Sequence, residues 1–445
     1  MPGGLLTDLY ELNMAASYLR RDMDGLATFS LYVRGLPAQR GFLVAAGLES
    51  CLDFLASFSF TDDELATLRE MGFDDRALTD LGALRFDGEV WAVPEGTVVY
   101  SEEPLLEVTA PVAMAQIVET YLLNQITLHT TLASKAARYV LAADGHDLVD
   151  FAFRRTHGTE AAMAIARASA MVGFVATSNV EAGRRFDLTV AGTMAHAFIE
   201  AFPSEREAFE AFAVDHPGRA TFLVDTYDTE QGVRTAIATI EALGLRERIG
   251  VRLDSGDLDA LSRTARTLLD AAGLPQARVF ASGGLDEHEV AALIGGGAPI
   301  DAFGIGTQMG VSADAPFVDS VYKLTEFDGR PTLKLSSGKA SLPGRKQVWR
   351  TIGDGEHRDT LGLRDEAGPP DTRPLLEPVM RGGRPLTSPP SIADAQRTFQ
   401  GELAQVPAAA RRLEHPEQVE VARSAALLEL TNETRAAALA KAEIG

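Results

Sequence analysis

The chain has 445 residues, of which 46% are hydrophobic and 23% are charged, and its formal net charge at pH 7 is −22. Two domains are expected, because this length exceeds what one hydrophobic core usually organises. The sequence has no block of Lys or Arg, which argues against nucleic acid as a partner. No apolar stretch approaches the roughly 20 residues of a membrane helix, since Arg167 interrupts the best candidate. A membrane partner is therefore not expected either.

The only cysteine, Cys51, lies in an apolar stretch and is expected to pack in a core. One cysteine excludes an intrachain disulfide and a thiolate zinc site. Residues 1–14 lack the basic region and long apolar core of a signal peptide. With cysteine used so sparsely, these features predict a cytoplasmic location.

The first part of the chain has a mixed character. The pattern predicts a helix within residues 5–19 and a strand within 27–36. Residues 86–110 are typical of short strands separated by Pro-Glu-Gly and Ser-Glu-Glu turns. A long helical stretch, 112–143, follows.

From residue 147 to residue 307 one pattern recurs, a short apolar run followed by an Ala- and Leu-rich helical stretch. The predicted strands are 147–154, 173–179, 188–193, 220–228, 248–257, 277–284 and 301–307. The predicted helices include 159–172, 229–243, 257–273 and 286–296. Continuous apolar strands alternating with helices indicate a parallel sheet that is buried on both faces.

Almost every one of these strands ends in residues capable of chemistry. They are Arg154, Ser178 and Asn179, Thr193 and His196, Asp225, Arg252 and Asp254, Ser282 and Gly283, and Gly306 and Thr307. An open doubly wound sheet gathers its chemistry at one switch point, whereas a (β/α) barrel has it at the carboxyl ends of all strands. We therefore expect an α/β fold with a closed, TIM-like (β/α) barrel. The alternative is that these are ordinary polar loop residues.

After the barrel pattern, residues 321–339 predict a hairpin with Asp328 and Gly329 at its turn. Residues 352–400 are rich in Gly, Pro, Asp and Arg and are interpreted as loops, and 410–442 as a charged amphipathic helix. These features predict a second, smaller α+β domain built from both ends of the chain. The predicted division is an N-terminal domain, 1–125, a barrel, 126–345, and a loop-rich and helical region that packs on the N-terminal domain, 346–445.

The loops after the last two strands are candidates for phosphate binding. Gly283 and Gly284 precede a predicted helix, and Gly306 and Thr307 follow the final strand. Glycines at strand ends let backbone N–H groups approach an anion closely, and the last loops of barrels frequently bind phosphate. Glycine also makes turns, which is the alternative.

Arg252 and Asp254 stand two residues apart on one strand, so their side chains share a face. Arginine offers a planar fork to phosphate or carboxylate. Asp254 and Asp225, from neighbouring strands, could share one Mg²⁺ ion. The alternative is a structural ion pair between Arg252 and Asp254.

Two further groups are candidates. Phe151, Phe153 and Arg154 would suit a flat anionic ring, which can stack while its charge meets the guanidinium. His196 stands among apolar neighbours, either as a packed side chain or as a reactive group. Aromatic residues in strands usually belong to the core, and single histidines usually pack.

Nine segments of the chain belong together: LLTDLYELNM, DFAFRR, TSNV, GTMAHAF, VDTYDT, VRLDSGDL, ASGGLDE, FGIGT and RKQVWR. In this order, over about residues 5–350, they resemble the nicotinate phosphoribosyltransferase family. The resemblance implies an irregular α/β barrel with a smaller domain built from both termini, and a homodimer with shared active sites. It implies the joining of nicotinate to phosphoribosyl pyrophosphate (PRPP), giving nicotinate mononucleotide and pyrophosphate in NAD salvage. ATP would be a co-substrate, hydrolysed through a phosphohistidine, and Mg²⁺ a cofactor.

The resemblance also implies roles for individual residues. His196 would be the phosphorylated histidine and, with Arg252 and Asp254, would act in catalysis. Asp225 and Asp254 would hold Mg²⁺. The residues implied for nicotinate are Phe151, Arg154, Ser178, Asn179, Thr193 and Tyr10 of the neighbouring subunit. Those implied for phosphate and PRPP are Arg154, Arg252, Ser282, Gly283, Gly284, Gly306 and Thr307.

Three alternatives remain at this point. A nicotinamide phosphoribosyltransferase shares the chemistry, but the neutral Ser178 and Asn179 stand where that family carries an aspartate, which favours nicotinate. A quinolinate-processing relative would need several more basic residues and would not need His196. A catalytically inactive barrel could act as a metabolite sensor. If another histidine carries the phosphate, His157 is the second choice.

Overall fold

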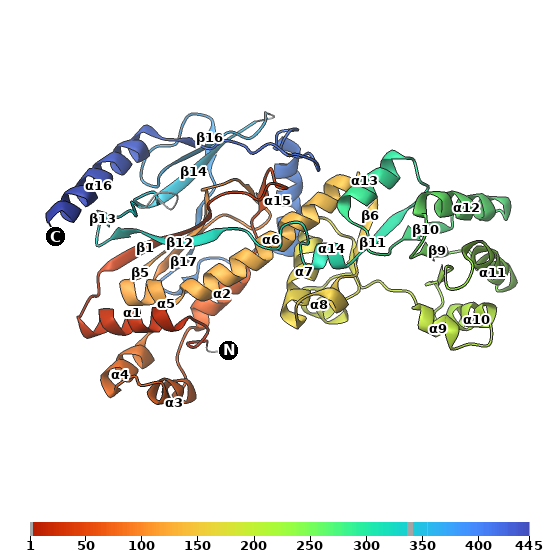
Figure 1. Ribbon diagram of the computed structural model, residues 1–445, viewed down its shortest axis with the longest axis horizontal. Coiled ribbons are helices and arrows are strands. Elements are labelled where there is room, and N and C mark those ends of the chain that lie inside the picture. The colour runs from red at the N-terminus through yellow and green to blue at the C-terminus, as the bar shows by residue number, and fades with distance from the viewer. Residues whose placement is uncertain (1–2, 336–340, 354, 445) are drawn as a thin grey trace. The chain divides into compact units, whose positions relative to one another are not determined.

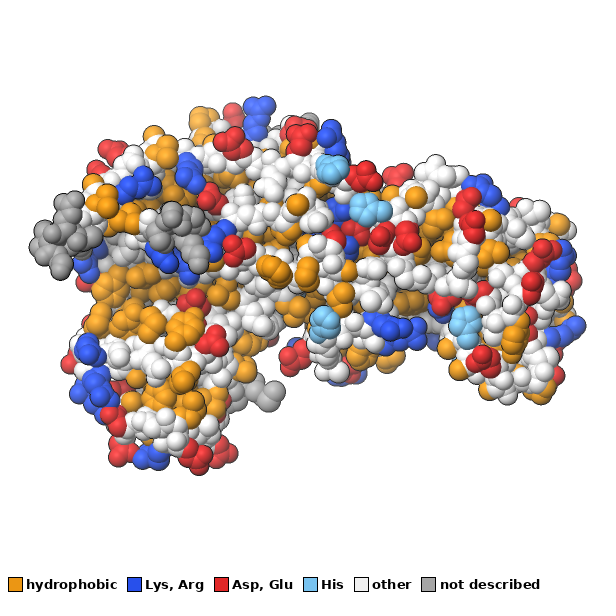
Figure 2. Space-filling model, viewed as in Figure 1, with side chains coloured by type: hydrophobic (Ala, Val, Ile, Leu, Met, Phe, Trp, Pro, Cys, Tyr) orange, Lys and Arg blue, Asp and Glu red, His pale blue; other side chains and the backbone are white. Residues whose placement is uncertain are grey.

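The computed structural model describes residues 3–335, 341–353 and 355–444 (Figure 1). The chain divides into two compact units, one made of Met1–Ser134 with Phe317–Gly445 and the other of Lys135–Pro316. No helix among the described residues is long and apolar enough to cross a membrane. Acidic and basic side chains are interspersed on the face shown in Figure 2.

The unit formed by both ends of the chain is built on a seven-stranded antiparallel sheet in the order β13-β12-β1-β5-β3-β17-β18. Its strands are β1 (Leu26–Val33), β3 (Glu89–Ala92), β5 (Pro104–Pro111), β12 (Ser320–Phe327), β13 (Arg330–Pro331), β17 (Glu377–Arg381) and β18 (Arg384–Pro385). The central strands come from the two ends of the sequence, because β1 pairs with both β5 and β12. β12 and β13 form the predicted hairpin, whose turn residues Asp328 and Gly329 have φ of 51° and 71°. Residues 336–339 of that prediction lie outside the described residues.

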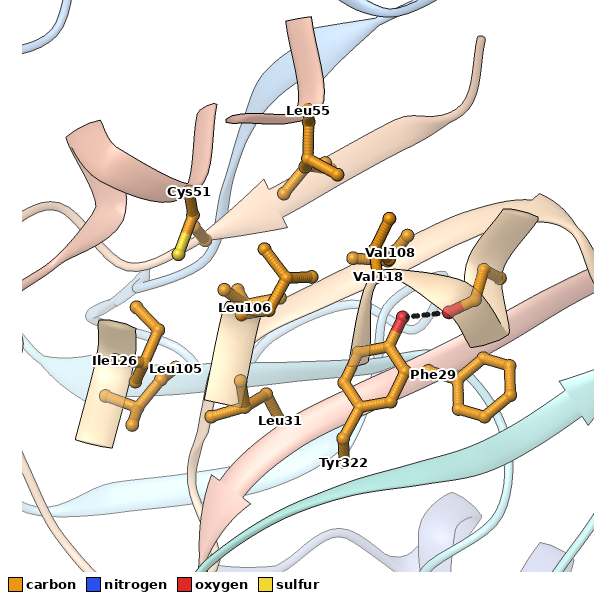
Figure 3. Close-up of a cluster of buried hydrophobic side chains, with 14 of the residues drawn as sticks. Phe29, Leu31, Cys51, Leu55, Leu105, Leu106, Val108, Val118, Ile126 and Tyr322 are labelled. Atoms are coloured by element: carbon orange, nitrogen blue, oxygen red, sulfur yellow. Dashed lines mark hydrogen bonds between the residues drawn. The ribbon is translucent and has the colours of Figure 1, made fainter. Parts of the chain in front are cut away.

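The core of this unit is apolar and continuous (Figure 3). The rings of Phe29 on β1 and Tyr322 on β12 stack with their centroids 4.7 Å apart. The Tyr322 hydroxyl donates a hydrogen bond of 2.8 Å to the carbonyl of Ala115, so its polar end is satisfied inside the core. Cys51 is buried here as a free thiol, which confirms the predicted packing role.

A smaller sheet has the order β16-β14-β15-β19. Its strands are β14 (Lys346–Thr351), β15 (Asp359–Leu363), β16 (Thr372–Pro374) and β19 (Ala422–Arg423). The prediction of loops over 352–400 is therefore wrong, since β15, β16, β17 and β18 lie there. These strands have five residues or fewer, which leaves little local pattern to detect. The predicted helix over 410–442 begins only at Ala425.

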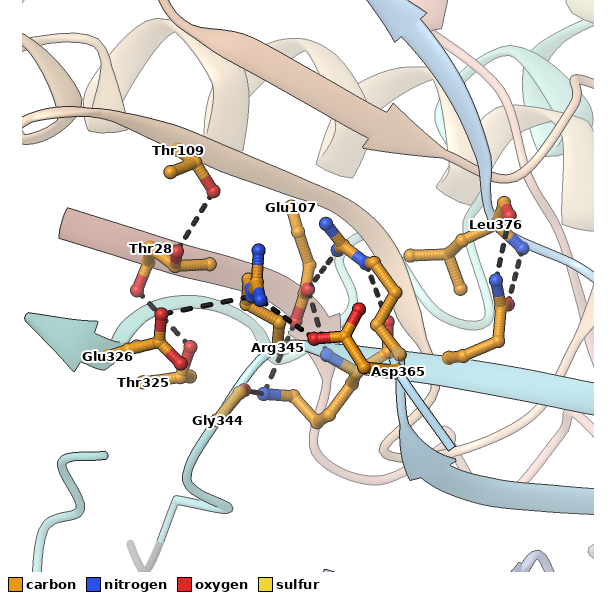
Figure 4. Close-up of polar contacts among 12 residues, drawn as sticks. Thr28, Glu107, Thr109, Thr325, Glu326, Gly344, Arg345, Asp365 and Leu376 are labelled. Carbon is orange, nitrogen blue, oxygen red and sulfur yellow. Dashed lines mark hydrogen bonds and ion pairs between the residues drawn. The ribbon is translucent and has the colours of Figure 1, made fainter. Parts of the chain in front are cut away.

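A buried charged cluster joins the two sheets (Figure 4). Glu107 on β5 is fully buried, and one of its oxygens accepts a hydrogen bond of 3.0 Å from the backbone N–H of Lys346. The Lys346 ammonium lies 3.3 Å from the other oxygen of this carboxylate, and Arg364 forms an ion pair with it. Two cations thus balance one carboxylate removed from water.

The remaining elements of this unit are mostly helices. They are α1 (Leu9–Arg20), α2 (Leu48–Ser57), α3 (Asp62–Glu70), α4 (Asp75–Ala83), α5 (Val112–Ile117), α15 (Ile392–Gln405), α16 (Ala425–Ile444) and the strand pair β2 (Leu43–Val44) and β4 (Val98–Val99). The long helix α6 (Glu119–Ala143) begins in this unit and ends in the other.

The second unit contains a six-stranded parallel sheet in the order β7-β6-β11-β10-β9-β8, a half-barrel with helices between its strands. Its strands are β6 (Asp147–Asp150), β7 (Ala176–Thr177), β8 (Thr221–Leu223), β9 (Gly250–Leu253), β10 (Arg278–Ala281) and β11 (Ala302–Ile305). Its helices are α7 (Thr159–Val172), α8 (Val180–Phe186), α9 (His196–Glu200), α10 (Glu205–Asp215), α11 (Thr229–Ala242), α12 (Leu258–Ala271), α13 (Glu287–Gly295) and α14 (Thr307–Gly310), with a short 3₁₀ turn at Phe153–Arg155. The alternation predicted from the sequence is confirmed. The expected strand over 188–193 contributes only a single parallel bridge between Thr177 and Val190.

Candidate active site

A pocket of about 630 Å³ opens at the carboxyl ends of the parallel strands, as expected for an α/β sheet. All the residues that line it belong to the unit Lys135–Pro316. They are Phe151, Phe153, Arg154, Thr156, Gly158, Thr159, Ser178, Gly192, Thr193, Met194, Ala195, His196, Leu223, Arg252 and Asp254.

The pocket brings together much of the site expected from the sequence. The predicted site residues that line it are Phe151, Phe153, Arg154, Ser178, Thr193, His196, Arg252 and Asp254. The lining residues that were not predicted are Thr156, Gly158, Thr159, Gly192, Met194, Ala195 and Leu223. Gly192, Met194 and Ala195 lie inside the GTMAHAF segment and could have been found from it, whereas the others carry no chemical signal of their own.

Phe151 forms one wall of the pocket at the end of β6. Its backbone N–H donates a hydrogen bond of 2.7 Å to the carbonyl of Ile305 on β11, which fixes the main chain that carries the ring. A Cβ atom on Gly304 would come within 2.6 Å of this ring, so glycine is needed there to make room for it. The guanidinium of Arg252 lies 5.5 Å from the ring centroid, in the range of a cation–π contact.

Arg252 on β9 is held from several sides and is only 11% exposed. It donates to the Ser282 hydroxyl at 2.8 Å, to the Thr193 hydroxyl at 3.1 Å and to the Met194 carbonyl at 3.2 Å. Its other terminal nitrogen lies 2.8 Å from a carboxylate oxygen of Asp254, so the ion pair weighed as an alternative does form. One N–H on this second nitrogen has no partner in that set and remains available for a ligand.

Asp254 and Asp225 stand at the ends of the paired strands β9 and β8. Burial alone would raise the pKa of Asp254, but the hydrogen bond from Ser282 and the charge of Arg252 outweigh burial and hold that pKa below its ordinary value. One oxygen of Asp225 accepts from the Asp254 backbone N–H at 3.0 Å and from the Ser255 hydroxyl at 2.5 Å. Its other oxygen is buried without a hydrogen-bond partner among the described residues.

That orphaned oxygen makes the carboxylate pair suitable for a divalent cation. The described part of the chain holds no group of three or more His, Cys, Asp and Glu side chains arranged for a metal. Mg²⁺ commonly takes only one or two protein carboxylates and completes its shell with water and substrate phosphates. Two carboxylates therefore fit Mg²⁺ better than a metal that needs a full protein cage.

His196 is the first residue of α9. Its Nδ1 lies 3.1 Å from the Thr226 hydroxyl, and its Nε2 lies 3.8 Å from a carboxylate oxygen of Asp254. The side chain is 39% exposed and lines the pocket, so it is open to a ligand rather than packed in the core.

The glycine loop after β10 is shaped for close approach. Gly283 has a φ of 112°, and a Cβ there would come within 2.0 Å of the Asp254 carbonyl oxygen. Gly284 has a φ of 81° with nothing within 4 Å of an added Cβ. The Ser282 hydroxyl faces Arg252 and Asp254. None of these three residues, nor Gly306 and Thr307 at the start of α14, lines the pocket itself.

Lys135 on α6 joins the loops that follow β10 and β11. Its ammonium lies 2.6 Å from Glu287, the first residue of α13, and 2.8 Å from Asp314, which follows α14. Arg138 reaches the second oxygen of Glu287 at 2.6 Å. The lysine, the arginine and Glu287 are all buried, so this cluster ties both candidate phosphate loops to one helix.

Three expected residues lie elsewhere. Asn179 is fully buried, where it caps α8 by accepting from the Ala182 N–H at 3.1 Å, and it does not line the pocket. Tyr10 lies on α1 of the other unit, half exposed. His157 is exposed and does not line the pocket.

Three family models match consecutive parts of the chain. They describe the N-terminal domain of nicotinate phosphoribosyltransferase (residues 5–127), the nicotinate phosphoribosyltransferase family (146–345) and the C-terminal domain (360–431). A nicotinate phosphoribosyltransferase of Mycobacterium tuberculosis is 48% identical over 416 residues, covering 93% of this chain and 89% of the relative. This chain belongs to the nicotinate phosphoribosyltransferase family. The resemblance noted in the sequence is thereby confirmed.

Two other relatives agree with this membership of the family. The nicotinate phosphoribosyltransferase of Bacillus subtilis is 42% identical over 378 residues, covering 81% of this chain and 76% of the relative. The crystal structure of human nicotinic acid phosphoribosyltransferase superposes with a TM-score of 0.87 at 28% identity, covering 96% of this chain and 99% of that one. A nicotinate-nucleotide pyrophosphorylase from Pyrococcus furiosus shares the fold, with a TM-score of 0.74 at 24% identity over 90% of this chain and 95% of that one.

Proposed function

We propose that the pocket of the unit Lys135–Pro316 joins nicotinate to PRPP and releases nicotinate mononucleotide and pyrophosphate, with ATP hydrolysis coupled through a phosphohistidine. The chain is a nicotinate phosphoribosyltransferase, an enzyme of NAD biosynthesis. One observation carries the proposal for the site: an aromatic wall, an arginine, a carboxylate and an accessible histidine meet around one pocket in a member of this family.

Nicotinate is flat and carries one negative charge, and the pocket offers a partner for each property. The Phe151 ring supplies a face for stacking, and Arg154 supplies a positive charge for the carboxylate. Ser178 lines the same pocket and is neutral, so it does not repel a carboxylate. Thr193 completes this part of the wall. These contacts favour nicotinate over nicotinamide.

PRPP brings a pyrophosphate that leaves as C1 of the ribose develops positive charge. Asp225 and Asp254 would hold Mg²⁺, which stabilises negative charge on a leaving phosphate. The second N–H on the terminal nitrogen of Arg252 that bonds Asp254 would also stabilise negative charge on the leaving pyrophosphate. The backbone N–H groups around Ser282, Gly283, Gly284, Gly306 and Thr307 would hold the 5′-phosphate from the two loops that Lys135 ties together.

We assign His196 the γ-phosphate of ATP, because its side chain is accessible and lines the pocket. A lone pair of the neutral imidazole attacks the γ-phosphorus, the bond to the β-phosphate oxygen breaks, and ADP leaves. Thr226 holds the ring by its Nδ1 side, and the carboxylate of Asp254 stands near Nε2. A later hydrolysis of the phosphohistidine would return the free enzyme.

The finer architecture is part of the same proposal. The bridge at Val190 and the contacts of Arg252 with Thr193 and Met194 support an irregular barrel that closes across the gap between β7 and β8. We place the domain boundaries where the two compact units divide, at Ser134/Lys135 and Pro316/Phe317, rather than at 125/126 and 345/346, because β12 pairs with β1 in the sheet of the other unit. We also place the enzyme in the cytoplasm, supported by its single buried thiol. A homodimer would bring Tyr10 of one subunit to the nicotinate site of the other.

The decisive experiment compares the purified enzyme with His196→Ala and His157→Ala. With nicotinate, PRPP and Mg²⁺ the wild-type protein should form nicotinate mononucleotide, faster when ATP is present. His196→Ala should lose ATP stimulation and the acid-labile phosphoenzyme while keeping slow ATP-independent turnover. His157→Ala, the matched control, should keep both. A phosphoenzyme that persists in His196→Ala and disappears in His157→Ala would overturn the assignment.

A further inference from the structure

Asp150 is a buried carboxylate that directly precedes Phe151 of the pocket wall. It is the last residue of β6 and is only 1% exposed. One carboxylate oxygen accepts a hydrogen bond of 2.8 Å from the Ala152 N–H, and the other accepts one of 2.7 Å from the Thr177 hydroxyl. Burial raises the pKa of this group to about 6, and these two hydrogen bonds only partly offset it. Burying a carboxylate costs more free energy than burying an apolar side chain, so we expect this carboxylate to have a specific role.

Thr177 is the matching residue at the end of β7. It lies opposite Asp150 in the parallel pairing of the two strands and is equally buried. Its hydroxyl donates to Asp150 and also accepts a hydrogen bond of 3.0 Å from the Asn179 N–H. The backbone repeats the connection, since the Ser178 N–H donates to the Asp150 carbonyl at 2.8 Å.

The residues that follow these two are pocket walls. Phe151 comes directly after Asp150, and Ser178 directly after Thr177, and both line the pocket. The Asp150 carboxylate also fixes the turn after Phe151, because it binds the N–H of Ala152 in the manner of an Asx turn. The Thr177 hydroxyl does the same for the turn that carries Ser178. One buried hydrogen bond therefore links the two turns.

We propose that Asp150 and Thr177 are positioning residues that set the spacing between the Phe151 ring and Ser178, and so determine the affinity for nicotinate. The inference rests on the proposed function, because it concerns the same base site. Neither side chain touches the base. They act by holding together the two turns that carry the Phe151 ring and the neutral Ser178 hydroxyl into the pocket wall.

Thr177→Val tests this most directly, because valine keeps the shape and removes the hydroxyl. The KM for nicotinate should rise about tenfold, the factor expected for one lost hydrogen bond to a carboxylate. The KM for PRPP should change less than twofold. Thr177→Ser restores the hydroxyl and should return the nicotinate KM to within about twofold of wild type. Thr239→Val is the matched control, since Thr239 is also fully buried but its hydroxyl bonds only within α11.

A merely structural role gives a different result. Thr177→Val would then lower the melting temperature as Thr239→Val does, with both KM values unchanged or raised together, and the proposal would be overturned. Should Thr177→Val not fold, Asp150→Asn replaces it, with nicotinate binding measured by calorimetry. Weaker binding supports the proposal, and unchanged binding contradicts it. Failure of the proposed function is distinguishable, because the wild-type enzyme itself would then form no nicotinate mononucleotide.

Discussion

Arg252 shows how one side chain can serve structure and chemistry together. Its guanidinium donates hydrogen bonds to Thr193 in one loop and to Ser282 and Asp254 at the ends of two strands. It also makes a cation–π contact with the Phe151 ring. Arg252 is preorganised, because its neighbours hold its side chain in one rotamer before a ligand binds, so binding costs little further side-chain entropy. Replacing Arg252 would remove the hydrogen bonds that hold Thr193, Ser282 and Asp254 together.

Gly283 is a second residue whose type is imposed by its surroundings. In Gly283→Ala the new Cβ would overlap the Asp254 carbonyl oxygen, and the φ of 112° would be strained as well. We expect kcat/KM for PRPP to fall about tenfold or more, because displacing Asp254 disturbs the carboxylate pair. Gly297→Ala, at a glycine with no role in the site, shares the positive φ (69°) but meets open space, so it should lose stability by about 1–2 kcal/mol while keeping most activity. Steady-state kinetics and thermal melts of both variants check this, and equal activity losses would contradict it.

At the residue level the sequence predicted more of the polar side chains that line the pocket than of the side chains that support them. His196, Arg252 and Asp254 stood out because of their chemistry at strand ends. Asn179 has equally suitable chemistry, yet its side chain turns inward to cap α8, a direction that depends on the helix it precedes. Asp150 went unnoticed because a carboxylate inside a strand gives no sign of what it will meet on the neighbouring strand.

At the level of elements, a helix with a clear local pattern was predicted correctly, whereas the short strands were not. The helix expected over 159–172 is α7 to the residue, since its ends are marked by Gly158 and Gly173, both with positive φ. The parallel strands were predicted too long. In the sequence the polar residues directly follow each apolar run, but in the structure they lie beyond the end of the strand. The short strands β15 to β18 were missed, since each has only two to five residues and so shows little of the alternation that marks a strand.

At the scale of the whole molecule, the sequence predicted that both ends of the chain would contribute to one domain. The structure has a unit composed of Met1–Ser134 and Phe317–Gly445, in which β1 lies between β5 and β12. Such pairing cannot be deduced from local periodicity, because antiparallel partners nearly three hundred residues apart leave no trace in either segment alone. The expectation came from the change of sequence character on both sides of the β/α pattern, and the family resemblance agreed with it.

The stability of this first unit should depend on pH through His357. This histidine is buried beside Tyr100, whose hydroxyl lies 3.0 Å from Nδ1, and burial with the nearby charge of Arg350 lowers its pKa to about 3. Between that value and an unfolded pKa of 6.5 the unfolded chain binds a proton that the folded chain does not. Folding stability therefore falls as the pH falls through this window, by up to about 1.4 kcal/mol per pH unit.

Urea unfolding of the wild-type protein and of His357→Asn between pH 7.5 and 5.0 measures this contribution. The wild-type free energy of unfolding should decrease more steeply with falling pH than that of the variant, which has no imidazole to protonate. Parallel pH dependences would show that His357 does not contribute.

The central claim, that this pocket selects nicotinate, is tested most directly by competition between the two bases. The wild-type enzyme is given equal concentrations of nicotinate and nicotinamide with PRPP, Mg²⁺ and ATP, and both mononucleotides are separated and quantified. The positive charge of Arg154 and the neutral Ser178 predict that nicotinate mononucleotide will be the main product. Nicotinamide mononucleotide in equal or greater amount would contradict the account.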